Sequence, residues 1–307
     1  MKTIHNAKDL KPGGKKVCLA IGVFDGVHLG HQQIIRQTVA DARQHNALAL
    51  VITFDRHPNT VVAPDRVPPL IYSLPQKSRA IESLGADALL QIHFDESFSR
   101  QTGEAFIRSL GRDLGNIQSL CVGADFVFGH KRSGNVALLE KLGDELAFTA
   151  HGLAAVSLDV EIVSSTRIRE TIRAGNLDAA SQMLGRPYAI SGVVVEGDHI
   201  GQQLVFPTAN LEVTGLVLPP NGVYAGLARV GKNSHRLALN VGFRPTITPA
   251  APQLRVEAHL LDFSGNLYGQ ELEITLVAKL RDEKKFPSLD ELKAQIARDI
   301  AEAGRRF

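Results

Sequence analysis

Two histidines three positions apart, His28 and His31, end a glycine-rich segment with the residue types of a phosphate-binding turn. The segment follows the apolar run 17–21, which indicates a buried strand, and precedes a helical pattern over 31–44 with apolar residues at 34, 35, 39 and 42. A strand-to-helix turn offers backbone N–H groups and the positive end of a helix dipole to a phosphate. If the helix begins here, both imidazoles share one face and reach the same phosphate. The predicted nucleotide-binding residues of the turn are Gly22, Phe24, Asp25 and Gly30.

The turn is neither of the two commonest phosphate loops. It lacks the Lys-Ser/Thr ending of a P-loop and the G-x-G-x-x-G of a dinucleotide fold. Residues 22–31 resemble the signature of the nucleotidyltransferase superfamily, whose members move a nucleoside monophosphate from a triphosphate to an acceptor. The resemblance implies that His28 and His31 stabilise charge on the α-phosphate as pyrophosphate departs. The alternative is an ordinary glycine-rich turn with two incidental histidines, and the Gly-x-Phe-Asp-Gly context at a strand end argues against it.

The bulk composition excludes some classes of protein. A chain of 307 residues is long for one core and suits two domains. The net charge of +2, without basic runs, argues against a broad nucleic-acid or membrane surface. Cys18 and Cys121 lie in apolar strand-like runs, as expected of packed thiols rather than a disulfide or metal pair. No signal peptide, transit peptide or long apolar span is visible, which predicts a cytoplasmic protein, and the sequence leaves the oligomeric state open.

The first half of the chain alternates strand and helix patterns. Strand-like runs cover 17–23, 48–54, 88–94, 119–123 and 154–160, and helical patterns cover 31–44, 74–84, 103–110 and 135–142. This alternation predicts an α/β, Rossmann-like domain in which helices cover both faces of a parallel sheet.

The pattern of predicted elements changes after Leu184. Short runs follow one another without helices between them, at 189–195, 208–213, 223–230, 236–241, 256–263 and 271–280. They predict a small antiparallel barrel. A final helix is expected over 288–303, with Ser288 as its N-cap and Glu291 completing a capping box. The predicted domains are therefore 1–185 and 186–307.

Three further segments of the first half carry polar or aromatic groups. Residues 53–58 follow the second strand, at the edge where open α/β sheets bind ligands. Residues 121–134 place two Phe rings beside glycines and basic residues, which suits a planar ring with a phosphate; taken alone, the pattern equally fits core aromatics and a solvated loop. Residues 164–169 begin a helix with hydroxyls and two arginines, which is typical of a triphosphate clamp, although a plain N-cap with surface arginines also fits.

Together, these segments and Leu-Gly-Arg-Pro-Tyr at 184–188 resemble the adenylyltransferase domain of the prokaryotic bifunctional riboflavin kinase/FMN adenylyltransferase (FAD synthetase) family. The resemblance implies that the FMN phosphate attacks the α-phosphorus of ATP, giving FAD and pyrophosphate. It further implies a triphosphate site at Ser165, Thr166 and Arg167, and a flavin site that includes Asp125, Phe126 and Phe128. Asp55-Arg56 stands where the family usually has Glu-Pro, and Asn135 where it often has Asp; both departures are peripheral.

The resemblance continues through the second half of the chain. Residues 206–210 (Phe-Pro-Thr-Ala-Asn), 222–224, 240–246 and 256–263 are similar to the riboflavin kinase module, a six-stranded barrel that phosphorylates the ribityl 5′-hydroxyl with ATP. Thr208 and Asn210, two apart on a strand, point to one face and offer oxygen ligands that suit Mg²⁺. Glu257 matches the family's general base. The module also implies nucleotide contacts at Gly197 and Gly201 and a flavin contact at Arg244. Taken singly, the metal and base candidates also fit a turn and a solvent-facing carboxylate.

One departure from the family leaves an alternative open. Gln202 stands where the family typically has Arg, and so lacks a charge for a phosphate. Val205 replaces a glycine and is stiff where close nucleotide approach is expected. We expect a bifunctional enzyme that uses riboflavin, FMN, ATP and Mg²⁺. The alternatives are a monofunctional FAD synthetase with a flavin-binding but inactive kinase barrel, an adenylyl- or cytidylyltransferase for another acceptor, and a flavin-binding regulatory module.

Overall fold

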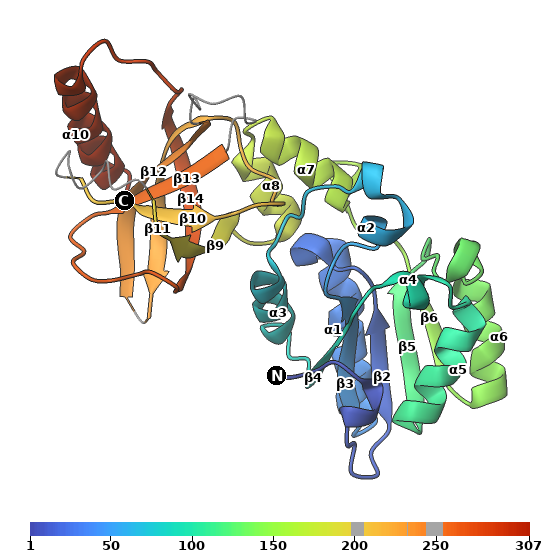
Figure 1. The fold of residues 1–307 in the computed structure, drawn as a ribbon. Coiled ribbons are helices and arrows are strands. Elements are labelled where there is room, and N and C mark those ends of the chain that lie inside the picture. Colours follow the sequence, from blue (N-terminus) through green and yellow to red (C-terminus); the bar gives the residue numbers. More distant parts are fainter. Residues whose placement is uncertain (198–205, 232, 244–253) are drawn as a thin grey trace. The chain divides into compact units, whose positions relative to one another are not determined.

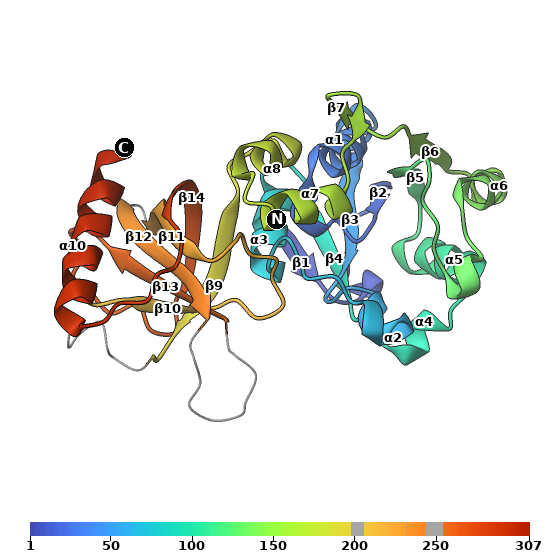
Figure 2. The same cartoon turned by 90° about the horizontal axis from the view of Figure 1, so that it is seen from above.

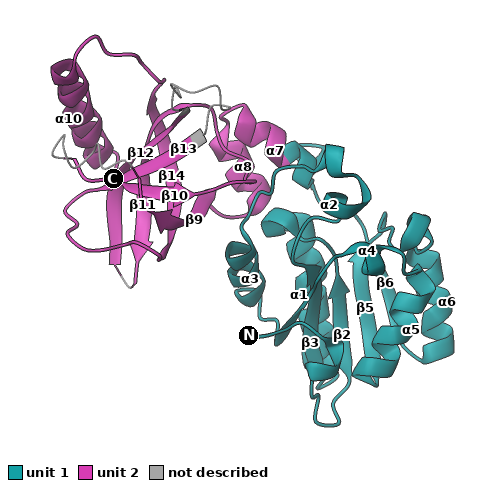
Figure 3. Ribbon diagram, viewed as in Figure 1, with its two compact units in different colours: residues 1–167 teal, residues 168–307 magenta. Residues whose placement is uncertain are grey.

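The computed structural model of the chain describes residues 1–197, 206–231, 233–243 and 254–307. The chain divides into two compact units, residues 1–167 and 168–307 (Figure 3). The first contains an α/β sheet and the second a β-barrel, as the sequence predicts.

The first unit is built on a parallel sheet of six strands in the order β1-β4-β3-β2-β5-β6 (Figure 1). Every residue of the central strand β2 is buried, as expected for a parallel strand with helices on both faces. The strands are β1 (Lys2–Ile4), β2 (Val17–Ile21), β3 (Leu48–Phe54), β4 (Ala88–Ile92), β5 (Ile117–Gly123) and β6 (Thr149–Leu153).

Alternate residues of β2 build two cores, one on each face of the sheet. Val17, Leu19 and Ile21 pack with side chains of α5 (Gly103–Leu114) and α6 (Val136–Leu146). Ala20 faces the opposite way, where it joins side chains of α1 (Leu29–Gln44) and α3 (Leu74–Glu82). The period-2 alternation of a strand thus distributes one apolar run between both layers of helices. The unit also contains α2 (Asn59–Val62), α4 (Glu96–Ser99), β7 (Ser157–Leu158), β8 (Glu161–Ile162) and the 3₁₀ turns η1 (Ala7–Asp9), η2 (Asp25–Val27), η3 (Pro64–Arg66) and η4 (His130–Arg132).

The second unit is a closed antiparallel barrel of six strands in the order β10-β13-β12-β11-β14-β9. The strands are β9 (Ala189–Val195), β10 (Ala209–Glu212), β11 (Gly222–Val230), β12 (Asn233–Phe243), β13 (Leu254–Leu260) and β14 (Glu271–Arg281). The terminal helix α10 (Leu289–Arg305) packs against β11, β12 and β14 (Figure 2). Ser288 caps this helix as predicted, since its Oγ accepts a hydrogen bond from the Glu291 N–H at 3.2 Å. Helices α7 (Ser165–Arg173) and α8 (Leu177–Leu184) precede the barrel.

One predicted strand is wrong. The edge strand of the parallel sheet is 149–153, not 154–160, of which only 157–158 forms a short strand, paired with β8. The sequence misleads here because His151 and Gly152 are poor strand formers, whereas 154–156 is apolar. Gly152 is closely packed, since a Cβ there would lie 3.0 Å from the Val136 side chain on α6. The three-residue strand β1 was also not predicted, because it is too short to show a period.

Both cysteines are buried and free, as predicted for packed thiols. Burial raises the pKa of Cys121 to about 12 and also raises the pKa of Cys18. Neither thiol is therefore ionised near neutral pH. Among the described residues, no helix is long and apolar enough to cross a lipid bilayer.

Candidate active sites

The order of strands in the parallel sheet marks where a ligand can bind. The chain runs from β2 through β3 to β4 on one side, and then through β5 to β6 on the other. The connections that leave β2 and β5 therefore diverge, and the carboxyl ends of these two strands mark the switch point, where open α/β sheets bind ligands. Residues 22–31 follow β2, and residues 124–134 follow β5. The predicted nucleotide motif and the predicted flavin motif thus both begin at the switch point of the sheet.

The turn after β2 has an unusual backbone. Phe24, Gly26 and Val27 have positive φ angles of 50°, 76° and 41°. The left-handed conformation costs little at glycine but is uncommon for Phe and strained for a β-branched Val, so surrounding contacts must hold the turn in place. Gly26 is also closely packed, because a Cβ there would lie 3.0 Å from a methyl of Ile71. Residues 22–30 therefore form a closely packed turn.

The two histidines stack on each other. Their ring centroids lie 3.6 Å apart with an angle of 21° between the planes. His28 is the N-cap of α1, and its Nδ1 accepts a hydrogen bond from the His31 N–H at 3.4 Å. Because Nδ1 accepts, the proton of a neutral His28 ring lies on Nε2. The edge of Phe24 meets the His31 ring at a centroid distance of 5.3 Å. The two imidazoles therefore lie together at the start of α1, and their joint action on one phosphate stays a prediction.

Asp25 anchors the turn rather than presenting a carboxylate to solvent. Its side chain is buried and accepts hydrogen bonds from the N–H groups of Ile71 and Tyr72 at 3.0 and 3.2 Å. Its backbone carbonyl accepts a hydrogen bond from Ser165 Oγ at 3.1 Å. Asp25 therefore ties the histidine turn both to the segment before α3 and to the first residue of α7.

The start of α7 is held by its own capping bond. Ser164 Oγ accepts from the Arg167 N–H at 3.2 Å. The Arg167 guanidinium pairs with Glu161, with Nε 3.0 Å from Oε2, and Nη1 donates to the carbonyls of Leu158 and Glu161. Thr166 is exposed. The structure thus brings Ser165 to the histidine turn, whereas the Arg167 guanidinium lies on the β7–β8 hairpin.

The loop after β5 presents stacked aromatic rings. The rings of Phe126 and Phe128 lie 5.1 Å apart at an angle of 17°, and both pack against the core while remaining partly exposed. Asp125 is exposed. Phe128 closes the loop through an antiparallel bridge with Gly134, where a Cβ would overlap the Phe128 ring. The loop combines core packing with a partly exposed aromatic surface, and the flavin site expected there stays a prediction.

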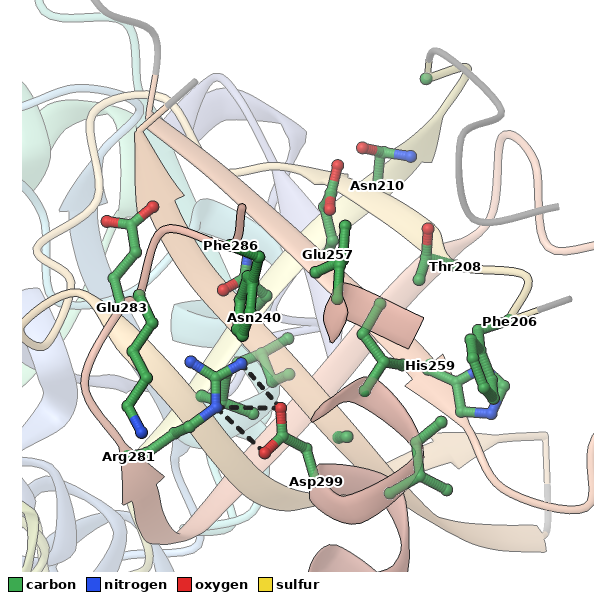
Figure 4. A pocket seen from close by; sticks show the side chains of 18 of the residues that line it. Phe206, Thr208, Asn210, Asn240, Glu257, His259, Arg281, Glu283, Phe286 and Asp299 are labelled. Atoms are coloured by element: carbon green, nitrogen blue, oxygen red, sulfur yellow. Dashed lines mark hydrogen bonds and ion pairs between the residues drawn. The ribbon is translucent and has the colours of Figure 1, made fainter. Parts of the chain in front are cut away.

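The barrel contains a cavity of about 400 Å³ that α10 helps to line (Figure 4). Glu257 on β13 lies in register with Asn210 on one neighbouring strand and Asn240 on the other. Side chains in one row across a sheet point to the same face, and all three line the cavity. A carboxylate between two amides is thereby placed on the cavity wall.

The segment that leads into β10 is fixed from outside the strand. His259 Nδ1 donates to the Pro207 carbonyl at 2.8 Å, and the His259 ring meets Phe206 edge to face. Thr208, which directly precedes β10, lines the same cavity as Asn210 (Figure 4). Gly197 lies against Asn210, because a Cβ on residue 197 would come within 2.2 Å of Asn210 Nδ2. Only glycine at 197 leaves Asn210 in this position.

An ion pair forms another part of the cavity wall. Arg281 on β14 donates from Nε to both carboxylate oxygens of Asp299 at 3.0 Å, and from Nη2 to Oδ2 at 2.7 Å. Gln295 Nε2 donates to Oδ1 of the same carboxylate at 2.8 Å. The guanidinium lies 5.8 Å from the centre of the Phe286 ring. These contacts join the barrel to α10.

Comparisons with known proteins assign both halves. A family model described as FAD synthetase matches residues 11–167, and one described as riboflavin kinase matches residues 184–307. Over its whole length the chain is 38% identical to the bifunctional riboflavin kinase/FMN adenylyltransferase of Escherichia coli K12, and covers 98% of that protein. The chain belongs to the bifunctional riboflavin kinase/FMN adenylyltransferase family.

Other family members give the same picture. The proteins of that name from Haemophilus influenzae and Bacillus subtilis are 36% and 35% identical to the chain, each over all of this chain and 98% of the other. A crystal structure from Streptococcus pneumoniae, named as that of a macrolide-efflux protein, matches with a TM-score of 0.82 and 28% identity. The match covers 99% of this chain and 98% of that one.

The two matched regions leave residues 168–183 unassigned. This stretch holds most of α7 and all of α8 except its last residue, Leu184, and it belongs to the second compact unit. The boundary predicted at 185/186 stays a prediction.

Several predicted site residues of this family member lie outside the described residues. They are Gly201 and Arg244, together with the departures Gln202 and Val205. In the FAD synthetase half, the structure places Gly22, Phe24, Asp25, Gly30, His28 and His31 in one turn and brings Ser165 to it. In the riboflavin kinase half, it brings Gly197, Thr208, Asn210 and Glu257 to one cavity. Asn135, where the family often has Asp, caps α6 by accepting from the Leu138 N–H at 2.9 Å.

Sequence reasoning missed part of the riboflavin kinase cavity. Asn240 lies in the motif 240–246 without a predicted role, although strand pairing places it beside Glu257. A signal was present, because a polar residue within the apolar run 237–241 needs a partner or a ligand. The Arg281–Asp299 pair carries no local signal, since its members belong to a strand and a helix.

Proposed function

We propose that this chain is a bifunctional enzyme that phosphorylates riboflavin to FMN in the barrel and adenylylates FMN to FAD in the parallel-sheet unit. ATP is the co-substrate of both reactions. The observation that carries the proposal is that each unit groups candidate site residues: stacked histidines after β2, and Glu257 between Asn210 and Asn240 in the barrel cavity. Family similarity over both halves supports it.

In the FAD-forming reaction, an FMN phosphate oxygen attacks the α-phosphorus of ATP, and the bond from that phosphorus to the pyrophosphate oxygen breaks. The protein need not form a covalent intermediate, because positioning and stabilisation of charge account for catalysis of this kind. His28 would donate from Nε2 to the α-phosphate, since its Nδ1 is engaged by the His31 N–H. The stacked His31 ring would help to stabilise the negative charge that develops on the α-phosphate. Ser165, which contacts the histidine turn, and the neighbouring Thr166 would contact the triphosphate, and Phe126 and Phe128 the flavin.

In the kinase reaction, Glu257 would accept the proton of the ribityl 5′-hydroxyl while that oxygen attacks the γ-phosphorus of ATP. The residues nearby fit a magnesium ion, because Thr208 and Asn210 offer neutral oxygen ligands on one wall of the cavity. Thr208 and Asn210 would suffice as protein ligands, because Mg²⁺ usually keeps several waters and nucleotide phosphates bound to it. When bound, Mg²⁺ would neutralise phosphate charge. Gly197 keeps Asn210 in place for this role.

The test is chromatography of riboflavin, FMN and FAD after incubation of the protein with ATP and Mg²⁺, started either from riboflavin or from FMN. We expect FAD from both flavins. His28→Ala should abolish FAD formation while FMN accumulates, and Glu257→Gln should stop turnover of riboflavin but not of FMN. FAD from FMN alone in the unmodified protein would instead identify a monofunctional FAD synthetase. Absence of flavin turnover from either start would reject the proposal.

A further inference from the structure

One buried lysine of the parallel-sheet unit is held by two backbone carbonyls and a hydroxyl. Lys77 lies on α3 and is 8% exposed. Its Nζ donates to the Phe54 carbonyl at 2.9 Å, to Thr53 Oγ1 at 3.2 Å and to the Val23 carbonyl at 3.3 Å. Thr53 Oγ1 in turn donates to the same Val23 carbonyl at 2.9 Å. The ammonium therefore joins the end of β3 to the turn that follows β2.

Burial destabilises the charged form of Lys77. Burial lowers the pKa of Lys77 to about 8, although the carboxylates of Asp25 and Asp55 act in the opposite direction. Lys77 follows Leu74 by three residues and precedes Ile81 by four, so it occupies the apolar stripe of α3, where a leucine or methionine would satisfy packing. A lysine here needs a reason other than the stability of the helix.

The reason lies in the peptide that Lys77 holds. Val23 immediately precedes Phe24, whose left-handed backbone starts the histidine turn. The Phe24 ring packs edge-on against His31, which stacks on His28. Fixing the Val23 carbonyl fixes the peptide plane before Phe24, and through it the ring that supports the histidine pair. A strained residue keeps its conformation only when neighbouring contacts determine it.

We propose that Lys77 is a positioning residue for adenylyl transfer, whose ammonium holds the Val23–Phe24 peptide and thereby the catalytic histidines. The inference rests on the proposed FAD-forming activity of this unit. Lys77 does not touch the reacting atoms; it acts through the backbone of the turn. A displacement of about 1 Å at a reacting group can cost about 100-fold in rate, so loss of this contact should affect kcat.

The test compares Lys77→Met with the unmodified enzyme and with Lys141→Met, which removes an exposed lysine on α6. Steady-state FMN adenylyltransferase kinetics should give a kcat about 100-fold lower in Lys77→Met, with KM for FMN and ATP within about threefold. Riboflavin phosphorylation by the same chain should be unchanged, which controls for folding and concentration. Lys141→Met should match the unmodified enzyme in both reactions.

The variant Thr53→Val gives an independent test, since it removes the Thr53 hydroxyl and leaves the Lys77 ammonium. We expect kcat to fall about tenfold, and the double variant to be no slower than Lys77→Met alone, because both act on the same carbonyl. A kcat within about threefold of the unmodified enzyme in Lys77→Met would overturn the proposal, as would fully multiplicative effects in the double variant. If Lys77→Met does not fold, Thr53→Val at full kcat overturns it. An unmodified enzyme without FAD formation would instead reject the proposed function.

Discussion

The ion pair between Arg281 and Asp299 offers the sharpest test of what joins α10 to the barrel. Their side chains are 16% and 8% exposed, and three hydrogen bonds connect them. Asp299→Ala removes the carboxylate and leaves a buried guanidinium without its counter-charge. Breaking a buried pair in this way costs about 3–5 kcal/mol. The same helix supplies a matched control, since Glu302 pairs with Arg306 at the surface, and loss of such an i,i+4 pair costs at most about 0.5 kcal/mol.

The assay is native-state hydrogen exchange of peptides covering 289–305, combined with riboflavin kinase kinetics. In Asp299→Ala the free energy of opening of α10 should fall by about 3–5 kcal/mol, and KM for riboflavin should rise because the pair lines the cavity. Arg281→Met combined with Asp299→Leu should recover most of the loss, since it removes both charges. FMN adenylyltransferase activity should not change. Equal protection of α10 in Asp299→Ala and Glu302→Ala would refute the reasoning.

Three further predictions concern single positions. Gly197→Ala should lower riboflavin phosphorylation at least about tenfold without affecting FAD formation from FMN, because the new Cβ displaces Asn210; turnover of each flavin measures this. Gly26→Ala should destabilise the first unit by about 1–3 kcal/mol in denaturant titrations, since it combines a φ of 76° with a contact of 3.0 Å to Ile71, and an unaltered midpoint would contradict this. The Lys77 pKa is about 8 in the fold against 10.5 in the unfolded chain, so the unfolded state binds more protons in that window. Stability of the first unit should therefore rise by about 3 kcal/mol between pH 8 and pH 10.5 through this group, and Lys77→Met should lack that part of the rise.

Much of the fold follows from local periodicity. The fully apolar run of β2 and the alternating helical patterns predict a parallel sheet, and the closely spaced strands after residue 188 predict the barrel. The edge strand 149–153 could not be found in this way. Its Gly152 lies close to Val136 on α6, and that contact depends on packing between elements.

Within the candidate sites, some residues follow from the sequence and others depend on contacts between distant elements. The histidine turn is a continuous segment, so its residues and their grouping are visible in the sequence. The contacts of Lys77 with Val23 and of Arg281 with Asp299 join residues 54 and 18 positions apart. In the sequence, such pairs are indicated at most by a charged residue within the apolar stripe of a helix. The placement of Asn240 beside Glu257 required the register of β12 with β13, which periodicity alone does not provide.

The buried thiols of the parallel sheet have a practical consequence. Cys18 and Cys121 lie on the adjacent central strands β2 and β5, and both are inaccessible in the native fold. A thiol reagent can modify them only after these strands separate, so the labelling rate measures the opening of the first unit. The barrel contains no cysteine, and the chain has no tryptophan. The molecule thus carries its own unit-specific reporter, which can follow unfolding of the FAD-forming half while the kinase half contributes no signal.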